Sequence, residues 1–365
     1  MSQPFIKLTR GVPPDESFPI DQLQTCAEYV LLVHGYQVLQ YGKAHGYMGL
    51  REIIADEKGV DPGRVIVGQG SLQLQDLCAR MVVNPGDPVY VEEPTYDRAL
   101  TIFRRAGARV VGFDLERDGV DVEAMASRLD GGENPVLFYV IPDFQNPSGT
   151  LLSGEKRQRI AELARTHDFW IIEDVPYRQL RYRGEELPSL LNLAPDHVLQ
   201  MSSYSKLISP GLRVGYVIVP QLLVDSLAKM AEDTYINASY LNQAIVADFM
   251  RRGWLEPQIE QIKGIYEPRL YTTLSALEEH MTDLATWQKP DGGFFVGVTL
   301  NEDVDTDDLL RRAGEENLGL TDGRGFFVDR VKGSCFVRLP FCALTAQQIE
   351  EGVGRLAEVV RSLGR

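Results

Sequence analysis

The sequence predicts an α/β protein in which helices sandwich a mostly parallel sheet, with a smaller α+β part attached. Three observations predict this class. Helical and strand patterns alternate from about residue 47 to residue 235, as in a mostly parallel sheet covered by helices. The pattern changes from Trp254 on, where helices and strands alternate less regularly. The 365 residues suggest two domains by size, and the 44% of hydrophobic residues can bury a large core.

The expected strands of the larger part are short apolar runs. They span residues 65–67, 89–92, 109–113, 136–141, 169–172, 198–202 and 214–219. Helical patterns between them span residues 71–83, 96–106, 154–167 and 221–231. These patterns predict a domain over residues 41–253.

The remainder of the chain predicts a smaller α+β domain over residues 254–365, which an N-terminal segment, residues 1–40, joins. Helical patterns are expected at residues 254–281, 306–316 and 346–363, and strands at residues 292–298 and 334–339. Neither an internal repeat nor a low-complexity tract interrupts these patterns.

Lys206 lies in a run of small hydroxyl residues, and Arg213 follows seven positions later. A lysine amine can condense with an aldehyde as a Schiff base, while hydroxyls and a guanidinium bind a phosphate dianion. Pyridoxal phosphate is the common cofactor that needs both a Schiff-base amine and a phosphate-binding site. The alternative is a solvated surface lysine, and the local sequence leaves both readings open.

Asp174 follows the apolar run 169–172, so it is expected at the carboxyl end of a buried strand, where ligands bind in open α/β sheets. A carboxylate there could hold the ring nitrogen of pyridoxal phosphate in its charged form. Tyr177, three residues later, could donate to the phenolic oxygen of the ring. A helix cap for Asp174 and a packing role for Tyr177 are the alternatives.

Two loops follow other predicted strands. Asn146 lies in the segment 141–149, where it could contact the same phenolic oxygen, although a stretch of Asn, Pro, Ser and Gly is also an ordinary turn. The run 65–72 reads as a strand, two glycines and a helix start at Ser71. Such a helix start can cradle a phosphate, and Ser71 is equally a good helix cap.

Taken together, these motifs resemble the fold-type I pyridoxal-phosphate-dependent aminotransferases of the class I and II superfamily. The resemblance is strongest to the 2-aminoadipate and aromatic aminotransferase group and to the effector domains of GntR-type regulators of the MocR kind. It runs from Leu8 to the C-terminus through residues 39–42, 46–51, 70–71, 93–96, 144–149, 173–177, 202–206 and 336–341. Because the pattern begins within the first dozen residues, we expect no DNA-binding domain.

The resemblance implies a seven-stranded type of sheet and a role for each matching residue. Lys206 would hold the aldehyde and carry a proton, and Asp174 would face the pyridine nitrogen. Tyr177 and Asn146 would contact the phenolic oxygen, and Tyr96 would stack on the ring. The phosphate would be bound by Gly70, Ser71, Leu72, Ser203, Ser205 and Arg213.

The resemblance further implies a homodimer with its active site at the subunit interface, because Tyr41 would reach the phosphate in the neighbouring subunit. Arg338 would clamp the substrate α-carboxylate, a task suited to a planar guanidinium, with Asn146 and Gly11 also binding substrate. Lys43 and His45 depart from the family pattern near the expected substrate mouth, which leaves donor specificity open.

Composition excludes several other classes. A net charge of −15 argues against a nucleic-acid surface, and the basic pairs of the chain are isolated. Four scattered cysteines without Cys-x-x-Cys spacing read as reduced packing residues, and five dispersed histidines predict no metal site. Without a signal peptide or a run of apolar residues long enough for a bilayer, we expect a cytoplasmic protein with no membrane partner.

The sequence therefore predicts a transaminase that moves an amino group from an L-amino acid to a keto acid such as 2-oxoglutarate by a ping-pong mechanism. Aromatic residues expected near the mouth, Phe18, Tyr41 and Phe326, favour aromatic or long aliphatic donors, and 2-aminoadipate-like donors stay open. Three alternatives remain. They are a lyase, decarboxylase or oxidase on the same scaffold, a non-catalytic ligand-sensing module, and an α/β protein without a cofactor.

Overall fold

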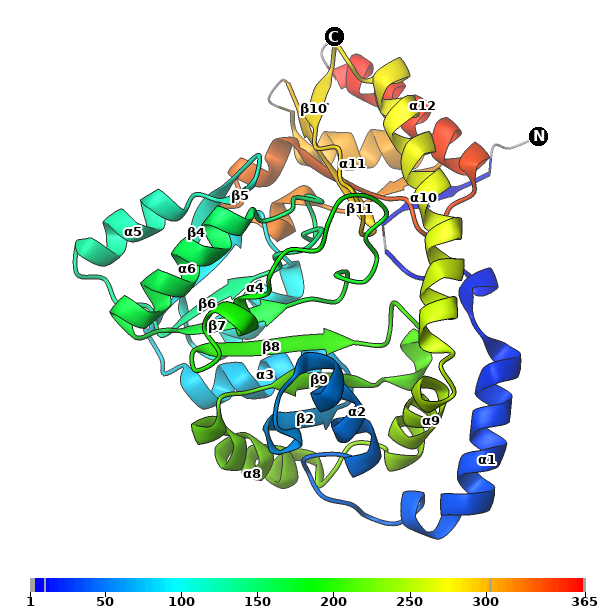
Figure 1. Ribbon diagram of the computed structural model, residues 1–365. Helices are drawn as coiled ribbons and strands as arrows, with labels where there is room; N and C mark the ends of the chain where they lie inside the picture. The colour runs from blue at the N-terminus through cyan, green and yellow to red at the C-terminus, as the bar shows by residue number, and fades with distance from the viewer. Residues whose placement is uncertain (1–3, 10, 302–303, 364–365) are drawn as a thin grey trace.

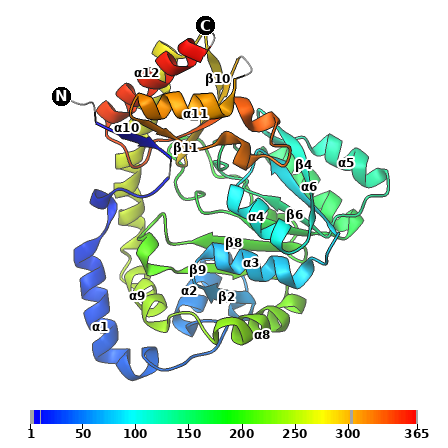
Figure 2. The same ribbon diagram turned by 180° about the vertical axis from the view of Figure 1, so that it is seen from behind.

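The computed structural model describes residues 4–9, 11–301 and 304–363. A central sheet of eight strands has the order β2-β9-β8-β7-β6-β3-β4-β5, and helices cover both of its faces (Figures 1 and 2). Its strands are β2 (Val65–Gly68), β3 (Pro88–Glu93), β4 (Arg109–Glu116), β5 (Gly119–Val120), β6 (Leu137–Val140), β7 (Trp170–Asp174), β8 (Val198–Ser203) and β9 (Gly215–Ile218). The predicted fold class is confirmed.

Five neighbouring strands of the central sheet, from β8 through β7, β6 and β3 to β4, are parallel. The outer strands β2, β9 and β5 pair antiparallel. All seven predicted strands are present, with ends that differ by a few residues. The two-residue strand β5, which is too short to leave a sequence pattern, is the eighth.

The helices α3 and α4 lie on the face seen in Figure 2, and α6 lies on the face seen in Figure 1. The helices up to residue 251 are α1 (Ile20–Val38), α2 (Met48–Lys58), α3 (Ser71–Val82), α4 (Asp97–Arg105), α5 (Val122–Asp130), α6 (Gly154–His167), α7 (Leu190–Leu193), α8 (Val224–Tyr235) and α9 (Tyr240–Arg251). Short 3-10 helices are η1 (Asp15–Ser17), η2 (Pro62–Arg64), η3 (Pro210–Leu212) and η4 (Gln221–Leu223).

The helix predicted over residues 154–167 has the bounds of α6 because both of its ends carry local signals. The Ser153 side chain accepts from the Lys156 N–H at the start, and Asp168 adopts a left-handed φ of 53° at the end. The pattern at 221–231, by contrast, divides into η4 and the longer helix α8.

Two small sheets lie at the end of the molecule where both termini are found (Figure 1). One has the antiparallel order β10-β11-β13, and the other pairs β1 with β12 in parallel. The strands are β1 (Ile6–Leu8), β10 (Ala285–Trp287), β11 (Phe295–Leu300), β12 (Leu318–Leu320) and β13 (Phe336–Pro340). The N-terminal strand thus joins the C-terminal part, while the exact domain boundaries stay a prediction.

The long helix α10 (Leu255–His280) runs from α9 to the small sheets, where α11 (Thr306–Glu315) and α12 (Ala346–Leu363) pack (Figure 1). The strand predicted at 292–298 begins only at Phe295. A Cβ atom on Gly292 or Gly293 would approach Phe144 to 2.5 Å, so these glycines form a close-packed turn instead. The strand predicted at 334–339 begins at Phe336, because η6 (Lys332–Cys335) precedes it, and η5 (Gly323–Phe326) lies earlier in the same connection.

A buried ionic cluster fixes the loop between β6 and α6. The Asp143 carboxylate, which is fully buried, accepts from Arg157 at 2.9 Å, Arg178 at 3.1 Å and Arg181 at 3.2 Å. Arg157 is likewise fully buried and comes from α6, while the other two arginines follow β7. The cluster therefore ties together the segments that follow two neighbouring strands.

Replacing Asp143 by Ala should destabilise the protein by about 3–5 kcal/mol, because it leaves a buried guanidinium without its counter-charge. Equilibrium urea unfolding measures this change. Asp130→Ala is the matched control, since Asp130 is exposed and its His167 partner lies 4.0 Å away. The control should change the free energy of unfolding by less than about 0.5 kcal/mol. Equal effects of the two substitutions would contradict a structural role for the cluster.

Candidate active site

Three neighbouring parallel strands deliver the central residues of the site at the same edge of the sheet. Asn146 follows β6, Asp174 is the last residue of β7, and Lys206 follows β8. In the register of the sheet Asp174 pairs with Met201, five residues before Lys206. Because the strands are parallel, their carboxyl ends meet, and this is where ligands bind in open α/β sheets.

These residues line a cavity of about 550 Å³. Twelve of the fourteen residues predicted for the site line it, and Gly70 and Tyr41 do not. The twelve are Gly11, Ser71, Leu72, Tyr96, Asn146, Asp174, Tyr177, Ser203, Ser205, Lys206, Arg213 and Arg338. The structure thus brings together residues from both ends of the chain.

The amine of Lys206 lies inside this cavity. Its Nζ donates to the Gly11 carbonyl oxygen at 2.9 Å and lies 5.2 Å from the centre of the Phe294 ring. Burial lowers the pKa of Lys206, and the positive charges of Arg338 and Arg213 lower it further. A lowered pKa increases the share of neutral amine, the form that acts as a nucleophile or a base.

Asp174 is buried, and only one of its two carboxylate oxygens has a hydrogen-bond partner among the described residues. Its Oδ2 accepts from the Tyr139 hydroxyl at 2.9 Å, while its buried Oδ1 has no partner among the described residues. Burial raises the pKa of Asp174 to about 7, and the hydrogen bond from Tyr139 opposes that shift. A cationic or protonated group placed in the cavity against Oδ1 would satisfy this oxygen and favour the charged carboxylate.

An anion cradle forms at the start of α3. Ser71 and Leu72 begin this helix, whose first N–H groups and positive dipole end face the cavity side. Gly70 has a φ of 90°, and a Cβ atom on it would lie 2.5 Å from Arg213 Nη2. Gly70 thus makes room for the guanidinium although it does not line the cavity itself.

The other side of the cradle comes from the segment after β8. The Ser203 hydroxyl donates to the Ser205 hydroxyl at 2.8 Å and accepts from the Ser205 N–H at 3.2 Å. Gly215 lets β9 lie close to the start of α3, because a Cβ atom on Gly215 would lie 2.5 Å from the Ser71 nitrogen. Two hydroxyls, a helix start and a guanidinium therefore converge, which is the donor set that suits a phosphate.

Arg338 lies on β13 and reaches the cavity from the small three-stranded sheet. Its Nη1 donates to Asn146 Oδ1 at 2.9 Å and its Nη2 donates to the Thr9 carbonyl oxygen at 2.7 Å. The guanidinium also lies over the rings of Phe295 and Phe326, at 4.6 and 4.7 Å. Its buried Nε has no partner among the described residues, which leaves a donor for an incoming carboxylate.

Two tyrosines line the middle of the cavity. Burial raises the pKa of Tyr96 to about 12 and raises that of Tyr177 well above its usual value, so both hydroxyls stay protonated donors. The Tyr177 ring packs against Phe294 and Phe295, with centroids 5.5 and 5.9 Å apart. Packing and cavity lining are therefore both roles of Tyr177.

Other residues expected near the mouth lie elsewhere. The Tyr41 side chain is 76% exposed, Phe18 does not line the cavity, and Phe326 is buried behind Arg338. Whether Tyr41 completes a neighbouring subunit's site stays a prediction.

Sequence reasoning missed several residues of the site. Tyr139 is the hydroxyl partner of Asp174, and the Thr9 carbonyl accepts from Arg338. Phe295 lines the cavity, and the Phe294 ring lies 5.2 Å from Lys206 Nζ. Only Tyr139 left a usable signal, because a lone hydroxyl in the apolar run of β6 needs a partner when the strand is buried. Backbone contacts such as that of Thr9 leave no signal in residue types.

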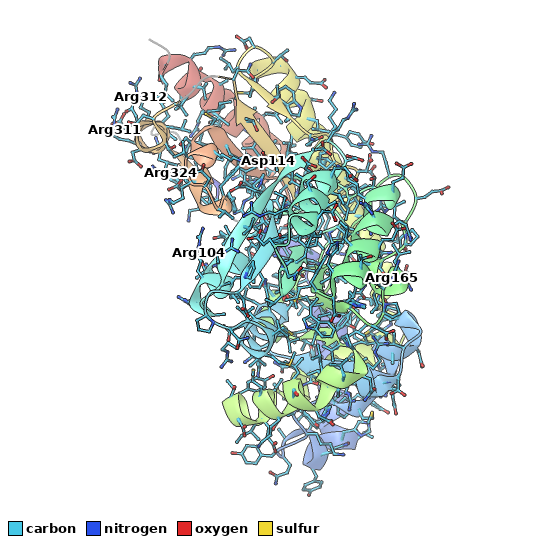
Figure 3. All side chains as sticks on the ribbon, turned by 90° about the vertical axis from the view of Figure 1, so that its left-hand side faces the viewer. Arg104, Asp114, Arg165, Arg311, Arg312 and Arg324 are labelled. Carbon is cyan, nitrogen blue, oxygen red and sulfur yellow. The ribbon has the colours of Figure 1, made fainter. Side chains whose placement is uncertain are left out.

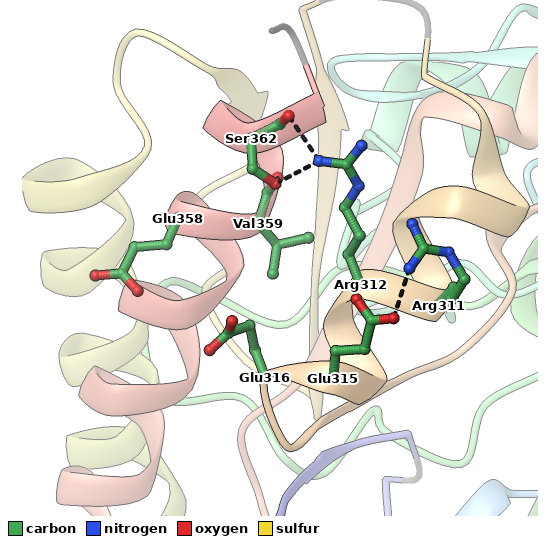
Figure 4. A pocket seen from close by; sticks show the side chains of 7 residues that line it. All are labelled: Arg311, Arg312, Glu315, Glu316, Glu358, Val359 and Ser362. Atoms are coloured by element: carbon green, nitrogen blue, oxygen red, sulfur yellow. Dashed lines mark hydrogen bonds and ion pairs between the residues drawn. The ribbon is translucent and has the colours of Figure 1, made fainter.

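A second cavity, of about 320 Å³, lies between α11 and α12 (Figure 4). Arg312 donates to the Ser362 carbonyl and hydroxyl oxygens at 2.8 and 3.2 Å, and Arg311 pairs with Glu315 at 2.5 Å. The arginines that line it are therefore already paired, and none of its lining side chains has a buried polar atom without a partner.

The described part of the chain contains no group of three or more His, Cys, Asp or Glu side chains that could hold a metal ion. None of its helices combines the length and the apolar character needed to cross a membrane.

Comparisons with known proteins agree with this geometry. A model of the family described as aminotransferase class I and II matches residues 3–356. The chain is 33% identical to aromatic-amino-acid aminotransferase 1 of Thermococcus litoralis, over 98% of this chain and 88% of that protein.

Two solved structures have closely similar folds. The first is an α-aminoadipate aminotransferase of Thermus thermophilus complexed with N-(5′-phosphopyridoxyl)-L-leucine. It has a TM-score of 0.93 and 31% identity, and covers 98% of this chain and 92% of its own. The second is a kynurenine aminotransferase of Pyrococcus horikoshii, with a TM-score of 0.95, 30% identity, and 99% and 91% coverage.

The raised pKa of Asp174 predicts a pH-dependent effect of Asp174→Asn on the cofactor-free protein. Folding raises the pKa of this carboxyl from 3.8 to about 7, so the folded state keeps a proton that the unfolded state releases. The wild type should therefore lose stability as the pH rises from about 4 to about 7. The variant has no carboxyl group at position 174 to ionise. Its free energy of unfolding should therefore rise relative to that of the wild type, by up to about 4 kcal/mol at pH 8.

Urea unfolding at pH 4 to 8 tests this expectation. The comparison with the variant removes the contributions of the other buried carboxylates, Glu92 and Glu173, whose pKa values burial also raises. A stability difference that stays constant across this pH range would show that Asp174 does not titrate as its burial implies.

Proposed function

The chain belongs to the class I and II aminotransferase family and is a transaminase; we propose that it uses pyridoxal 5′-phosphate to move the amino group of an L-amino acid to a keto acid such as 2-oxoglutarate. One observation carries this proposal. The amine of Lys206, the unpartnered Asp174 oxygen and an anion cradle line a single cavity.

The residues present fit the cofactor. The unpartnered Asp174 Oδ1 suits a protonated pyridine nitrogen, and the cradle of Ser71, Ser203, Ser205 and Arg213 suits its phosphate. Tyr96 would cover the ring, and the Asn146 and Tyr177 side chains would meet its phenolic oxygen. When bound, pyridoxal phosphate supplies an aldehyde that condenses with amines and a ring that draws electron density away from the bond that breaks.

The chain's own residues would then bind, orient and move a proton. Arg338 would bind the substrate α-carboxylate through its unpartnered Nε and the remaining N–H groups along the edge of its planar guanidinium. Lys206 Nζ, made less basic by burial, would accept the proton from the substrate Cα and deliver it again on the cofactor side. Phe294 and Phe295 would keep water from this amine.

The substrate class is drawn from the cavity wall and from the relatives. The ring of Phe295, which lines the cavity beside Arg338, favours aromatic or long aliphatic amino donors. The relatives compared above are named for aromatic amino acids, α-aminoadipate and kynurenine, which supports the same range and adds a 2-aminoadipate-like donor. Which of these donors the protein prefers remains for the half-reaction to decide.

A homodimer is proposed from the surface of α1 and the segment after it. Leu32, Tyr36, Leu39 and Tyr41 are 86%, 102%, 70% and 76% exposed, an unusual set of large apolar side chains in one stretch of the surface. A second copy packed there would bury this stretch and could bring Tyr41 to the neighbouring cradle. A cytoplasmic location is likewise a proposal.

The half-reaction tests the function. Purified protein loaded with pyridoxal phosphate and given an amino acid alone should release one keto acid per subunit and then stop until a keto acid is added. Lys206→Ala should slow this release by roughly 10²–10⁴-fold, because it removes the positioned proton carrier. Lys229→Ala, at an exposed lysine of α8 outside the cavity, is the matched control and should leave the rate unchanged.

Other outcomes identify the alternatives. Continued turnover on the amino acid alone would indicate a lyase, decarboxylase or oxidase. Bound cofactor without turnover on any amino acid would indicate a ligand-sensing module. The relatives compared above are named aminotransferases and favour neither alternative, whereas some other relatives, 27–30% identical to this chain, are named transcriptional regulators.

A further inference from the structure

A connecting segment, residues 323–335, leads from the cavity side of β12 to β13, which carries Arg338. It contains η5, η6 and the buried rings of Phe326 and Phe327. These rings pack with Phe336, at centroid distances of 6.1 and 5.5 Å, in an apolar cluster separate from the main core. The position of the connecting segment therefore depends on a small cluster and on its polar contacts.

The connecting segment places a ring against the proposed substrate clamp. Phe326 is 1% exposed and its ring centre lies 4.7 Å from the Arg338 guanidinium carbon. Since the guanidinium has two backbone or amide partners and a free Nε, the ring limits how far it can turn away from the cavity. A shift of the connecting segment would thus change the orientation of the Arg338 guanidinium in the cavity.

Glu93, the last residue of β3, holds the connecting segment from the central sheet. Its Oε1 accepts from the Asp329 N–H at 2.8 Å, and its Oε2 pairs with Lys332 Nζ at 3.2 Å. The Glu93 side chain is 4% exposed, which makes these contacts more valuable than an ion pair at the surface. Two residues later the Thr95 N–H donates to the Phe326 carbonyl oxygen at 2.8 Å.

The surroundings of Glu93 show that polar contacts, rather than dense packing, hold this position. Gly112 on the adjacent strand β4 makes room for the carboxylate, since a Cβ atom there would lie 2.9 Å from Glu93 Oε2. A cavity of about 370 Å³ lies beside the pair and is lined by Glu93, Lys332 and Phe327, among others. Side chains therefore do not fill this side of the connecting segment.

Lys332 has a second partner, Asp114, at 2.5 Å. Asp114 is 67% exposed and lies on β4, on the face labelled in Figure 3. An exposed pair of this kind contributes little in water, whereas the buried Glu93 carboxylate also holds a backbone N–H. Substitutions of Glu93 and of Asp114 can therefore be compared, because both carboxylates pair with Lys332.

We propose that Glu93 is a positioning residue for substrate binding, which acts on Arg338 through the connecting segment and the Phe326 ring. Tyr96, which lines the cavity, follows Glu93 by three residues. Glu93 therefore fixes the connecting segment relative to the side of the cavity that Tyr96 lines. The inference rests on the proposed function, because it takes Arg338 as the group that binds the α-carboxylate.

The half-reaction with an amino donor tests the proposal. Glu93→Ala should raise the KM for the donor by roughly 10–100-fold, the cost of a clamp displaced by up to about 1 Å. The maximal rate and the retention of pyridoxal phosphate should change little. Glu93→Gln keeps an acceptor for the Asp329 N–H and should fall between Glu93→Ala and the wild type. Asp114→Asn is the control and should leave KM unchanged.

A double substitution identifies the route. If Glu93 acts through Phe326, then Glu93→Ala should raise KM far less in a Phe326→Ala background than in the wild type. If Glu93→Ala raised KM by the same factor in the Phe326→Ala background as in the wild type, the proposed route would be overturned. An unchanged KM in Glu93→Ala and Glu93→Gln would overturn the proposal, as would a loss of bound cofactor without a rise in KM, which a merely structural role predicts.

These failures differ from a failure of the proposed function. If the wild type releases no keto acid from any amino donor, the proposed function fails. If the wild type does so and the Glu93 variants share its KM, the function stands and only the inference about Glu93 fails. Should Glu93→Ala not fold, Glu93→Gln still separates these outcomes, since it removes the charge of Glu93 and keeps an acceptor for the Asp329 N–H. Lys332→Met removes the pairs with both Glu93 and Asp114, and its comparison with Asp114→Asn isolates the pair with Glu93.

Discussion

The Asp174 carboxylate, buried at the end of β7 with one oxygen unsatisfied, is the constraint around which the site is arranged. A buried charge without a partner is costly, and Tyr139 satisfies only one of the two oxygens. The remaining oxygen can be satisfied by a protonated ring nitrogen in the cavity. Under the proposed function, bound pyridoxal phosphate would supply this partner for Asp174.

The rest of the site comes from two sheets that both contribute residues to the cavity lined by Asp174. Parallel strands of the central sheet deliver Asn146, Asp174 and Lys206 together because their carboxyl ends share one edge. The substrate side comes from the small three-stranded sheet, through Arg338 on β13. Backbone carbonyls, aromatic rings and the anchor at Glu93 then join the two sides, so the geometry of substrate and cofactor depends on contacts between distant parts of the chain.

Much of this arrangement could be predicted from the sequence where a local signal existed. The apolar runs located every long strand of the central sheet, and the strand-end position of Asp174 followed from them. The cap at Ser153 and the stop at Asp168 fixed α6, whereas the glycines at 292 and 293 looked like strand and form a close-packed turn. The Thr9 carbonyl on Arg338 and the contacts of Glu93 could not be predicted, because they join residues more than 230 positions apart and depend on tertiary packing.

The central claim is that the Lys206 amine forms the covalent bond to pyridoxal phosphate beside the Asp174 carboxylate. Borohydride reduction of the cofactor-loaded protein, followed by peptide mass mapping, tests it most directly. The account predicts a pyridoxyl phosphate adduct on the peptide that contains Lys206 and on no other lysine in stoichiometric amount. A loaded protein whose Lys206 peptide stays unmodified after reduction would contradict it.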